Sequence, residues 1–150
     1  MRSPGLKIKN YNYSSMSGFS LIEVLLATVL FGALVSVLVG AILYGQESML
    51  VAGYQSRAVF LAQEGAEAVR NIRDEHFANL QDGTYGLVFQ NGVWNLSGQE
   101  DTNGIYNRSI VISSIGTTTK DVLVKVTWKP TAQRDGVFTL ESRLTNWKRN

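Results

Sequence analysis

The sequence predicts an α+β fold in which a long N-terminal helix packs its second half on a C-terminal antiparallel β-sheet. Two observations support this prediction. No charged residue lies between Glu23 and Glu47. This uncharged stretch is longer than the roughly 20 apolar residues that a helix needs to cross a bilayer. Beyond residue 82 the apolar residues change from a helical period to an alternating one. A sheet with one apolar face needs a cover, and an amphipathic helix can supply it.

The 150 residues leave room for one globular domain beside the membrane helix. We expect four segments: a basic leader at 1–18, a transmembrane helix at 19–45, its amphipathic continuation at 46–80 and an antiparallel β-domain at 81–150. The leader is interpreted as a targeting segment rather than as part of the fold.

The basic residues at the start predict an orientation in the membrane. Arg2, Lys7 and Lys9 precede the apolar run, and no acidic residue comes before Glu23. Lys and Arg beside a spanning segment hold that end in the cytoplasm, so residues 47–150 are expected on the other side.

Net charge and cysteine content exclude several classes of protein. The formal net charge is +2, but Arg2, Lys7 and Lys9 account for three of the 14 basic side chains, against 12 acidic ones. Without the leader the protein is close to neutral, so no nucleic-acid binding is predicted. The chain has no cysteine, which excludes a disulfide framework, a lipid-modified cysteine anchor and thiolate metal sites.

The helix is expected to run without interruption from residue 19 to about 75, because the only prolines are Pro4 and Pro130. Charged residues such as Glu64 are interpreted as a solvated face. The opposite stripe recurs at three- and four-residue steps and comprises Ala58, Leu61, Ala62, Gly65, Ala68, Val69 and Ile72.

The first strands are predicted on either side of Asn91-Gly92, which is a strong two-residue hairpin signal between residues 85–90 and 93–96. A polar loop at 97–104 and a strand at 105–115 follow.

The last strands are predicted at 122–128 and from residue 138 to about 147, with a loop at 116–121 and a turn at 134–136. The three tryptophans fit core or strand-pair positions better than a ligand platform; they are Trp94, Trp128 and Trp147.

Glu23 is unexpected where it stands, because an ionisable residue in a membrane segment is costly and indicates a function with a specific partner. If the chain were cut between Gly18 and Phe19, the new α-amino group would lie about one helical turn from Glu23. The alternative is that Glu23 simply marks the aqueous end of an ordinary signal anchor.

The segment Gly18-Phe19-Ser20-Leu21-Ile22-Glu23-Val24, followed by an unbroken apolar helix, closely resembles the N-terminus of type IV pilins and type II secretion pseudopilins. The resemblance implies a pilin-like ladle fold, cleavage after Gly18 by a membrane-embedded prepilin peptidase and N-methylation of Phe19. It also implies that Glu23 is needed for entry of the subunit into the filament.

The same resemblance implies a structural subunit rather than an enzyme, without a cofactor. Its expected partners are the prepilin peptidase, other pilin or pseudopilin subunits, an inner-membrane assembly platform and membrane lipid. It would be a single-pass protein of the cytoplasmic membrane and then part of an extracellular or periplasmic filament. The lack of a disulfide, and Gly40 where major pilins often have proline, favour a minor pilin or pseudopilin.

Two further readings remain open. Glu100, Asp101 and Asn103 carry oxygen ligands in one loop, and some pseudopilins bind calcium in their β-domain, but the full ligand series is absent and a solvated turn is favoured. The chain could also be an uncleaved membrane-anchored module whose extracellular β-domain binds a ligand.

Overall fold

The computed structural model describes residues 18–131 and 134–147, in two compact units, residues 1–45 and 46–150. The predicted leader therefore lies outside the described residues, apart from Gly18. Helix α1 spans Leu21–Glu75 and is followed by a short 3₁₀ helix, η1, at Phe77–Asn79. The helix thus begins two residues later than predicted and ends at the predicted residue 75, so the last residues of the segment 46–80 lie beyond α1.

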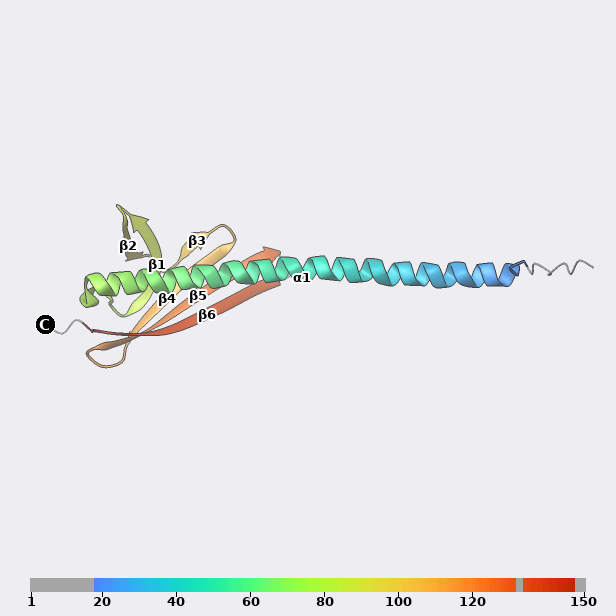
Figure 1. Ribbon diagram of the computed structural model, residues 1–150. Coiled ribbons are helices and arrows are strands. Elements are labelled where there is room, and N and C mark those ends of the chain that lie inside the picture. Colours follow the sequence, from blue (N-terminus) through green and yellow to red (C-terminus); the bar gives the residue numbers. More distant parts are fainter. Residues whose placement is uncertain (1–17, 132–133, 148–150) are drawn as a thin grey trace, which may run out of the picture. The chain divides into compact units, whose positions relative to one another are not determined.

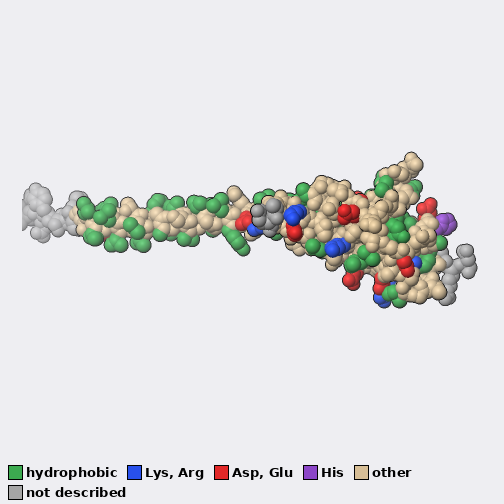
Figure 2. Space-filling model, turned by 180° about the vertical axis from the view of Figure 1, so that it is seen from behind, with side chains coloured by type: hydrophobic (Ala, Val, Ile, Leu, Met, Phe, Trp, Pro, Cys, Tyr) green, Lys and Arg blue, Asp and Glu red, His purple; other side chains and the backbone are tan. Residues whose placement is uncertain are grey.

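The first unit consists, in its described part, of the apolar beginning of α1. No residue of its most apolar stretch is buried, and α1 is long and apolar enough to cross a membrane. Figure 2 shows apolar side chains along this segment on the face that it displays. Exposure of such a surface to water is unfavourable, so this part of α1 is suited to an apolar surrounding.

The second unit contains a six-stranded antiparallel sheet in the order β2-β1-β4-β5-β6, with β3 also paired to β4 (Figure 1). The strands are β1 (Gly83–Gln90), β2 (Val93–Ser97), β3 (Asp101–Asn103), β4 (Tyr106–Ser114), β5 (Thr119–Thr131) and β6 (Arg134–Thr145).

The core of this unit lies between the sheet and the second half of α1. All seven residues of the predicted apolar stripe are buried, and Ala66 joins them. The side chains that face them from the sheet include Ile110, Ile112, Val122, Val124 and Val126. The α+β class and the packing of this helical stripe on an antiparallel sheet are therefore confirmed.

The predicted hairpin is also confirmed. Gln90 pairs with Val93, and both turn residues have positive φ, at 54° for Asn91 and 79° for Gly92. Two positive φ values define the turn that suits the twist of a two-residue hairpin, and Asn-Gly adopts it readily.

Three local predictions are wrong. The loop at 97–104 contains the short strand β3, and β5 begins at Thr119 within the predicted loop at 116–121. The expected turn at 134–136 belongs to β6. Gly136 pairs with Trp128, and a Cβ at Gly136 would lie 2.1 Å from the Trp128 ring, so this glycine makes room for the indole.

Pro130 is accommodated because it lies where the β5–β6 register shifts, between Trp128 and Thr131. Trp94 and Trp128 pack against the core as expected. Trp147 differs: it follows the end of β6 and is 61% exposed, although its indole nitrogen donates to Asp74 Oδ1 at 3.2 Å.

Candidate functional site

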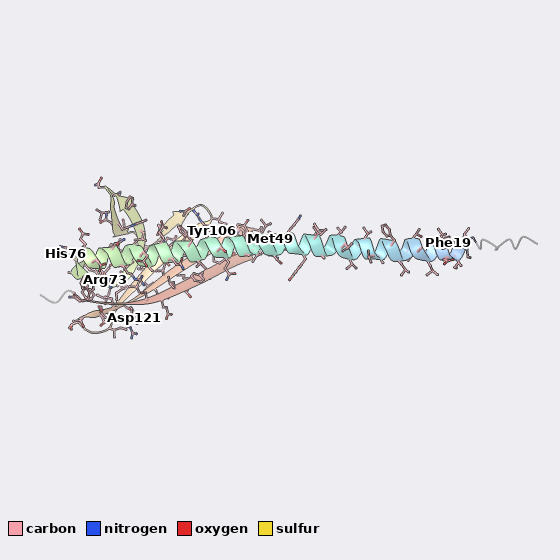
Figure 3. The ribbon with its side chains drawn as sticks, in the orientation of Figure 1. Phe19, Met49, Arg73, His76, Tyr106 and Asp121 are labelled. Carbon is pink, nitrogen blue, oxygen red and sulfur yellow. The ribbon has the colours of Figure 1, made fainter. Side chains whose placement is uncertain are left out.

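The predicted processing residues lie just before the first turn of α1. Gly18, Phe19 and Ser20 have no regular secondary structure, and Phe19 is 83% exposed (Figure 3). Added atoms at Gly18 would meet nothing within 4 Å. The backbone on both sides of the Gly18–Phe19 bond is therefore accessible in the described chain.

Glu23 belongs to the first turn of the helix. The Ser20 carbonyl accepts hydrogen bonds from the backbone nitrogens of Glu23 at 3.0 Å and Val24 at 3.2 Å. A carboxylate in the first turn interacts favourably with the positive end of the helix dipole. The helix alone therefore partly compensates the charge, but in an apolar surrounding a cation would add far more.

A shallow groove of about 530 Å³ runs along this face of the helix. Among the described residues that line it, Glu23 is the only charged one, and it is flanked by Phe19, Ala27 and Phe31 at four-residue steps. Residues 18–45 contain no other charged side chain. This face of the helix is thus an exposed apolar surface with one carboxylate near its start.

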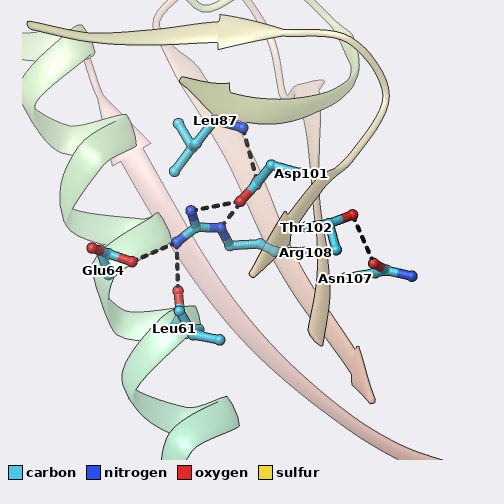
Figure 4. A network of polar contacts seen from close by, with 7 residues as sticks. All are labelled: Leu61, Glu64, Leu87, Asp101, Thr102, Asn107 and Arg108. Carbon is cyan, nitrogen blue, oxygen red and sulfur yellow. Dashed lines mark hydrogen bonds and ion pairs between the residues drawn. The ribbon is translucent and has the colours of Figure 1, made fainter. Parts of the chain in front are cut away.

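A second polar cluster, which the sequence analysis missed, centres on Arg108 in β4 (Figure 4). Arg108 is only 5% exposed. Its Nε and Nη2 donate to the two carboxylate oxygens of Asp101 at 3.1 and 2.9 Å. Its Nη1 donates to the Leu61 carbonyl at 2.9 Å and to Glu64 Oε2 at 3.0 Å.

This cluster connects three elements. Leu61 and Glu64 belong to α1, whereas Asp101 lies in β3 and also accepts a hydrogen bond from the Leu87 nitrogen in β1 at 2.9 Å. Glu64, interpreted from the sequence as part of a solvated face, is only partly exposed and uses its carboxylate to pair with Arg108. A signal was present: Arg108 lies two residues from both Tyr106 and Ile110, on the same inward-facing side of β4, where a charge needs a partner.

Among the described residues, no contact brings the three weak calcium candidates to a common point. Asp101 directs both carboxylate oxygens to Arg108, while Asn103 is an exposed residue that pairs with Tyr106. Glu100 is exposed as well. Within residues 18–131 and 134–147, no group of three or more His, Asp or Glu side chains is arranged to hold a metal ion.

The outer face of the sheet carries a groove of about 450 Å³ in which Asp121 and Arg143 form an exposed ion pair, with Nε and Oδ1 2.7 Å apart. The hydrogen bond from Arg143 lowers the pKa of Asp121 and raises that of the guanidinium. Val111 and Leu123 complete the floor with other residues.

Comparisons with known proteins find no matching family model, no similar curated protein and no similar solved structure.

Proposed function

We propose that this chain is a structural subunit of a type IV pilus or type II secretion pseudopilus, with a pilin-like fold. One observation carries the proposal: the segment Gly18-Phe19-Ser20-Leu21-Ile22-Glu23 directly begins an uninterrupted helix whose apolar side chains are exposed. An ordinary anchor accounts for the exposed apolar helix, but it does not account for this combination of residues at its start.

In this proposal the chain is a prepilin, cut after Gly18 and N-methylated at Phe19. Lipid covers the apolar part of α1 before assembly, and the helices of neighbouring subunits replace that lipid in the filament. The exchange hides Glu23 from water, so its carboxylate needs a cation. The α-amino group of Phe19, on the same chain or on a neighbour, is the cation that cleavage creates.

The second unit would remain outside the cytoplasm as the globular head of the subunit. It contains all the buried core residues of the described chain, which suits a head that folds around its own core. The subunit would be a minor pilin or a pseudopilin, and its dependence on a prepilin peptidase and an inner-membrane assembly platform follows from the same proposal.

Intact mass spectrometry with N-terminal fragmentation, on protein from native membranes, tests the processing step. We expect a mature chain that begins at Phe19 and carries a methyl group. A chain that still carries residues 1–18, in cells with an active prepilin peptidase, would overturn the proposal and support an uncleaved membrane-anchored binding module instead.

A matched variant makes this test specific. Gly18→Leu changes the residue before the proposed cut and should block cleavage. The structure has open space at this position, so the added side chain should not disturb α1. Gly32→Ala, within the same helix and also in open space, should be processed normally.

A further inference from the structure

The two edges of the sheet differ in how they are protected against pairing with another strand. The edge strand β6 carries exposed charges at Arg134, Asp135, Glu141 and Arg143, and its pairing with β5 is irregular near Pro130. Charges and irregularities on an edge are the usual means of preventing unwanted association.

The opposite edge, β2, has none of these protections. Its five residues are Val93-Trp94-Asn95-Leu96-Ser97, and no charged residue or proline occurs anywhere between Gly83 and Gln99. Within the described residues, β2 pairs only with β1. An uncharged strand with a free row of backbone donors and acceptors is a template for a further strand.

The hairpin geometry shows which backbone groups of β2 are free. In the two-residue turn Gln90 and Val93 form a hydrogen-bonded pair. Hydrogen-bonded and non-hydrogen-bonded pairs alternate along an antiparallel ladder, so Asn95, opposite Val88, is also bonded to β1. The N–H and C=O groups of Trp94 and Leu96 therefore point away from β1, towards the free edge.

We propose that β2 pairs antiparallel with β2 of a second copy of this chain, about a two-fold axis that passes through Asn95. Trp94 would then exchange backbone hydrogen bonds with Leu96 of the second copy, and Leu96 with its Trp94. The two Asn95 residues would face each other as a non-hydrogen-bonded pair.

The side chains favour this partner. A two-fold axis places the central residue opposite itself, so a charge there would be repelled by its own copy, whereas Asn95 is neutral. Trp94 would lie beside Leu96 of the second copy, and aromatic–aliphatic cross-strand pairs are stabilising. Both side chains are already half-buried against the core of their own chain, so little of their freedom remains to be lost.

The charged edge β6 is a poorer partner for β2, because β2 offers no opposite charges to compensate the exposed charges of β6.

This contact goes beyond the proposed filament function. The two-fold axis of an antiparallel strand pair is perpendicular to the sheet, so it reverses every direction within the sheet plane, whereas subunits along a polar filament all point the same way. The β2 contact would therefore join two filaments, or two subunits outside a filament.

Single cysteines can test the proposal cleanly because the natural chain has none. Facing residues of a non-hydrogen-bonded pair have Cα atoms about 4.5 Å apart, within the range that a disulfide spans. The full-length Asn95→Cys protein, in a large excess of detergent micelles, should form a disulfide-linked dimer under mild oxidation. Substitution of Asn95 removes only a long 3.4 Å bond from its side chain to the Val93 carbonyl.

Val93→Cys and Ser97→Cys define the register. Each lies two residues from the axis, so a residue and its own copy would be separated by about 13 Å along the strands, too far for a disulfide. Neither variant should cross-link to itself. Mixed together, with a size tag on one, they should cross-link to each other, because Val93 faces Ser97 of the second copy.

Two outcomes would overturn the proposal. In the first, Asn95→Cys forms no dimer although a maleimide labels its thiol. In the second, all three variants cross-link to themselves to the same extent, which would indicate non-specific association. Adding Asn95→Lys to the mixed pair should abolish its cross-link by placing two like charges on the axis. Gln90→Lys, exposed on the neighbouring strand, should not.

The result is separate from the filament proposal. Glu23→Ala should leave the Asn95→Cys cross-link unchanged, because Glu23 and β2 belong to different units. Failure of the β2 contact would leave the processing of the N-terminus untouched.

Discussion

At the scale of single residues, Arg108 is a buried charge that connects the helix and the sheet of the second unit. Its guanidinium is buried, and each of its three nitrogens donates to an oxygen of α1 or β3. A guanidinium suits this role because its planar fork can bind both oxygens of Asp101 while it also reaches the helix.

Arg108→Met should destabilise the protein by roughly 3 kcal/mol, because it leaves Asp101 and the Leu61 carbonyl without their donor in a largely buried place. The midpoint of urea unfolding, followed by tryptophan fluorescence on the full chain in detergent, measures the loss. Arg108→Lys should recover only part of it, since an ammonium cannot form the paired contact with Asp101.

Arg70→Met is the matched control for this experiment. Arg70 also pairs with a glutamate, Glu67, but on the exposed face of α1, where the side chains are 44% and 63% exposed. Its loss should cost no more than about 0.5 kcal/mol. Equal effects of the two substitutions would show that burial of Arg108 contributes nothing.

Glycines provide a second prediction at this scale. Gly86 in β1 lies against the backbone of Glu100, where an added Cβ would come within 2.4 Å of a carbonyl carbon. Gly86→Ala should therefore cost about 1–3 kcal/mol, because backbone yields less easily than a side chain. Gly53→Ala, in open space on α1, should instead stabilise the helix by up to about 1 kcal/mol. The same unfolding measurement distinguishes the two, and a neutral Gly86→Ala would contradict the close approach.

At the scale of elements, the sheet is tied together at one end by Asp82, which immediately precedes β1. Its Oδ1 accepts from Lys120 Nζ at 2.7 Å and from Ser114 Oγ at 2.8 Å, so it links β1 to the ends of β4 and β5. These hydrogen bonds lower the pKa of the Asp82 carboxyl below its ordinary value, and the bond from Lys120 has the largest effect.

A lowered pKa means that the folded state favours the charged carboxylate. Its contribution to stability is present above the ordinary carboxyl pKa of about 4 and is lost as the pH falls through the lowered value. Asp82→Asn should therefore lower the urea midpoint at pH 7, and the difference from the natural protein should shrink as the pH falls below about 4. A difference that persists undiminished in acid would show that charge on Asp82 is not its cause.

The elements also show what could be predicted from sequence. The buried stripe from Ala58 to Ile72 and the Asn91-Gly92 hairpin follow from local periodicity and turn chemistry, and both are confirmed. The strand at Arg134–Gly136 could not be found this way. Gly136 belongs to it because a residue without a side chain leaves room for Trp128, which lies on another strand. The partners of Arg108 likewise lie 7 to 47 positions away, beyond any local pattern.

The predicted processing and assembly residues form a different case. The structure places Gly18, Phe19 and Glu23 at the accessible start of α1, but their roles depend on a peptidase and on neighbouring subunits that a single chain does not contain. Those roles stay predictions, as does the side of the membrane on which the second unit lies.

At the scale of the whole molecule, the two units have opposite requirements. The second buries its apolar residues between α1 and the sheet, whereas the first exposes them and depends on an external apolar medium. Two such media, lipid and a bundle of like helices, cover apolar side chains about equally well. If the chain assembles as we propose, hydrophobicity alone gives little preference for the filament over the membrane, and a polar interaction would have to contribute to the choice.

Glu23 is the one charged residue placed to make that choice, as it is alone among residues 18–45. Glu23→Ala should still insert into the membrane but should weaken or abolish incorporation into filaments, measured by shearing filaments from cells and comparing sheared with membrane-bound subunit. Glu47→Ala is the control: the same helix loses a carboxylate, but one whose partner is Arg134 of its own chain, at 2.5 Å. If Glu23→Ala subunits were sheared off as efficiently as Glu47→Ala subunits, pairing of Glu23 with an amino terminus would not drive assembly, and shape complementarity between helices would have to select the filament instead.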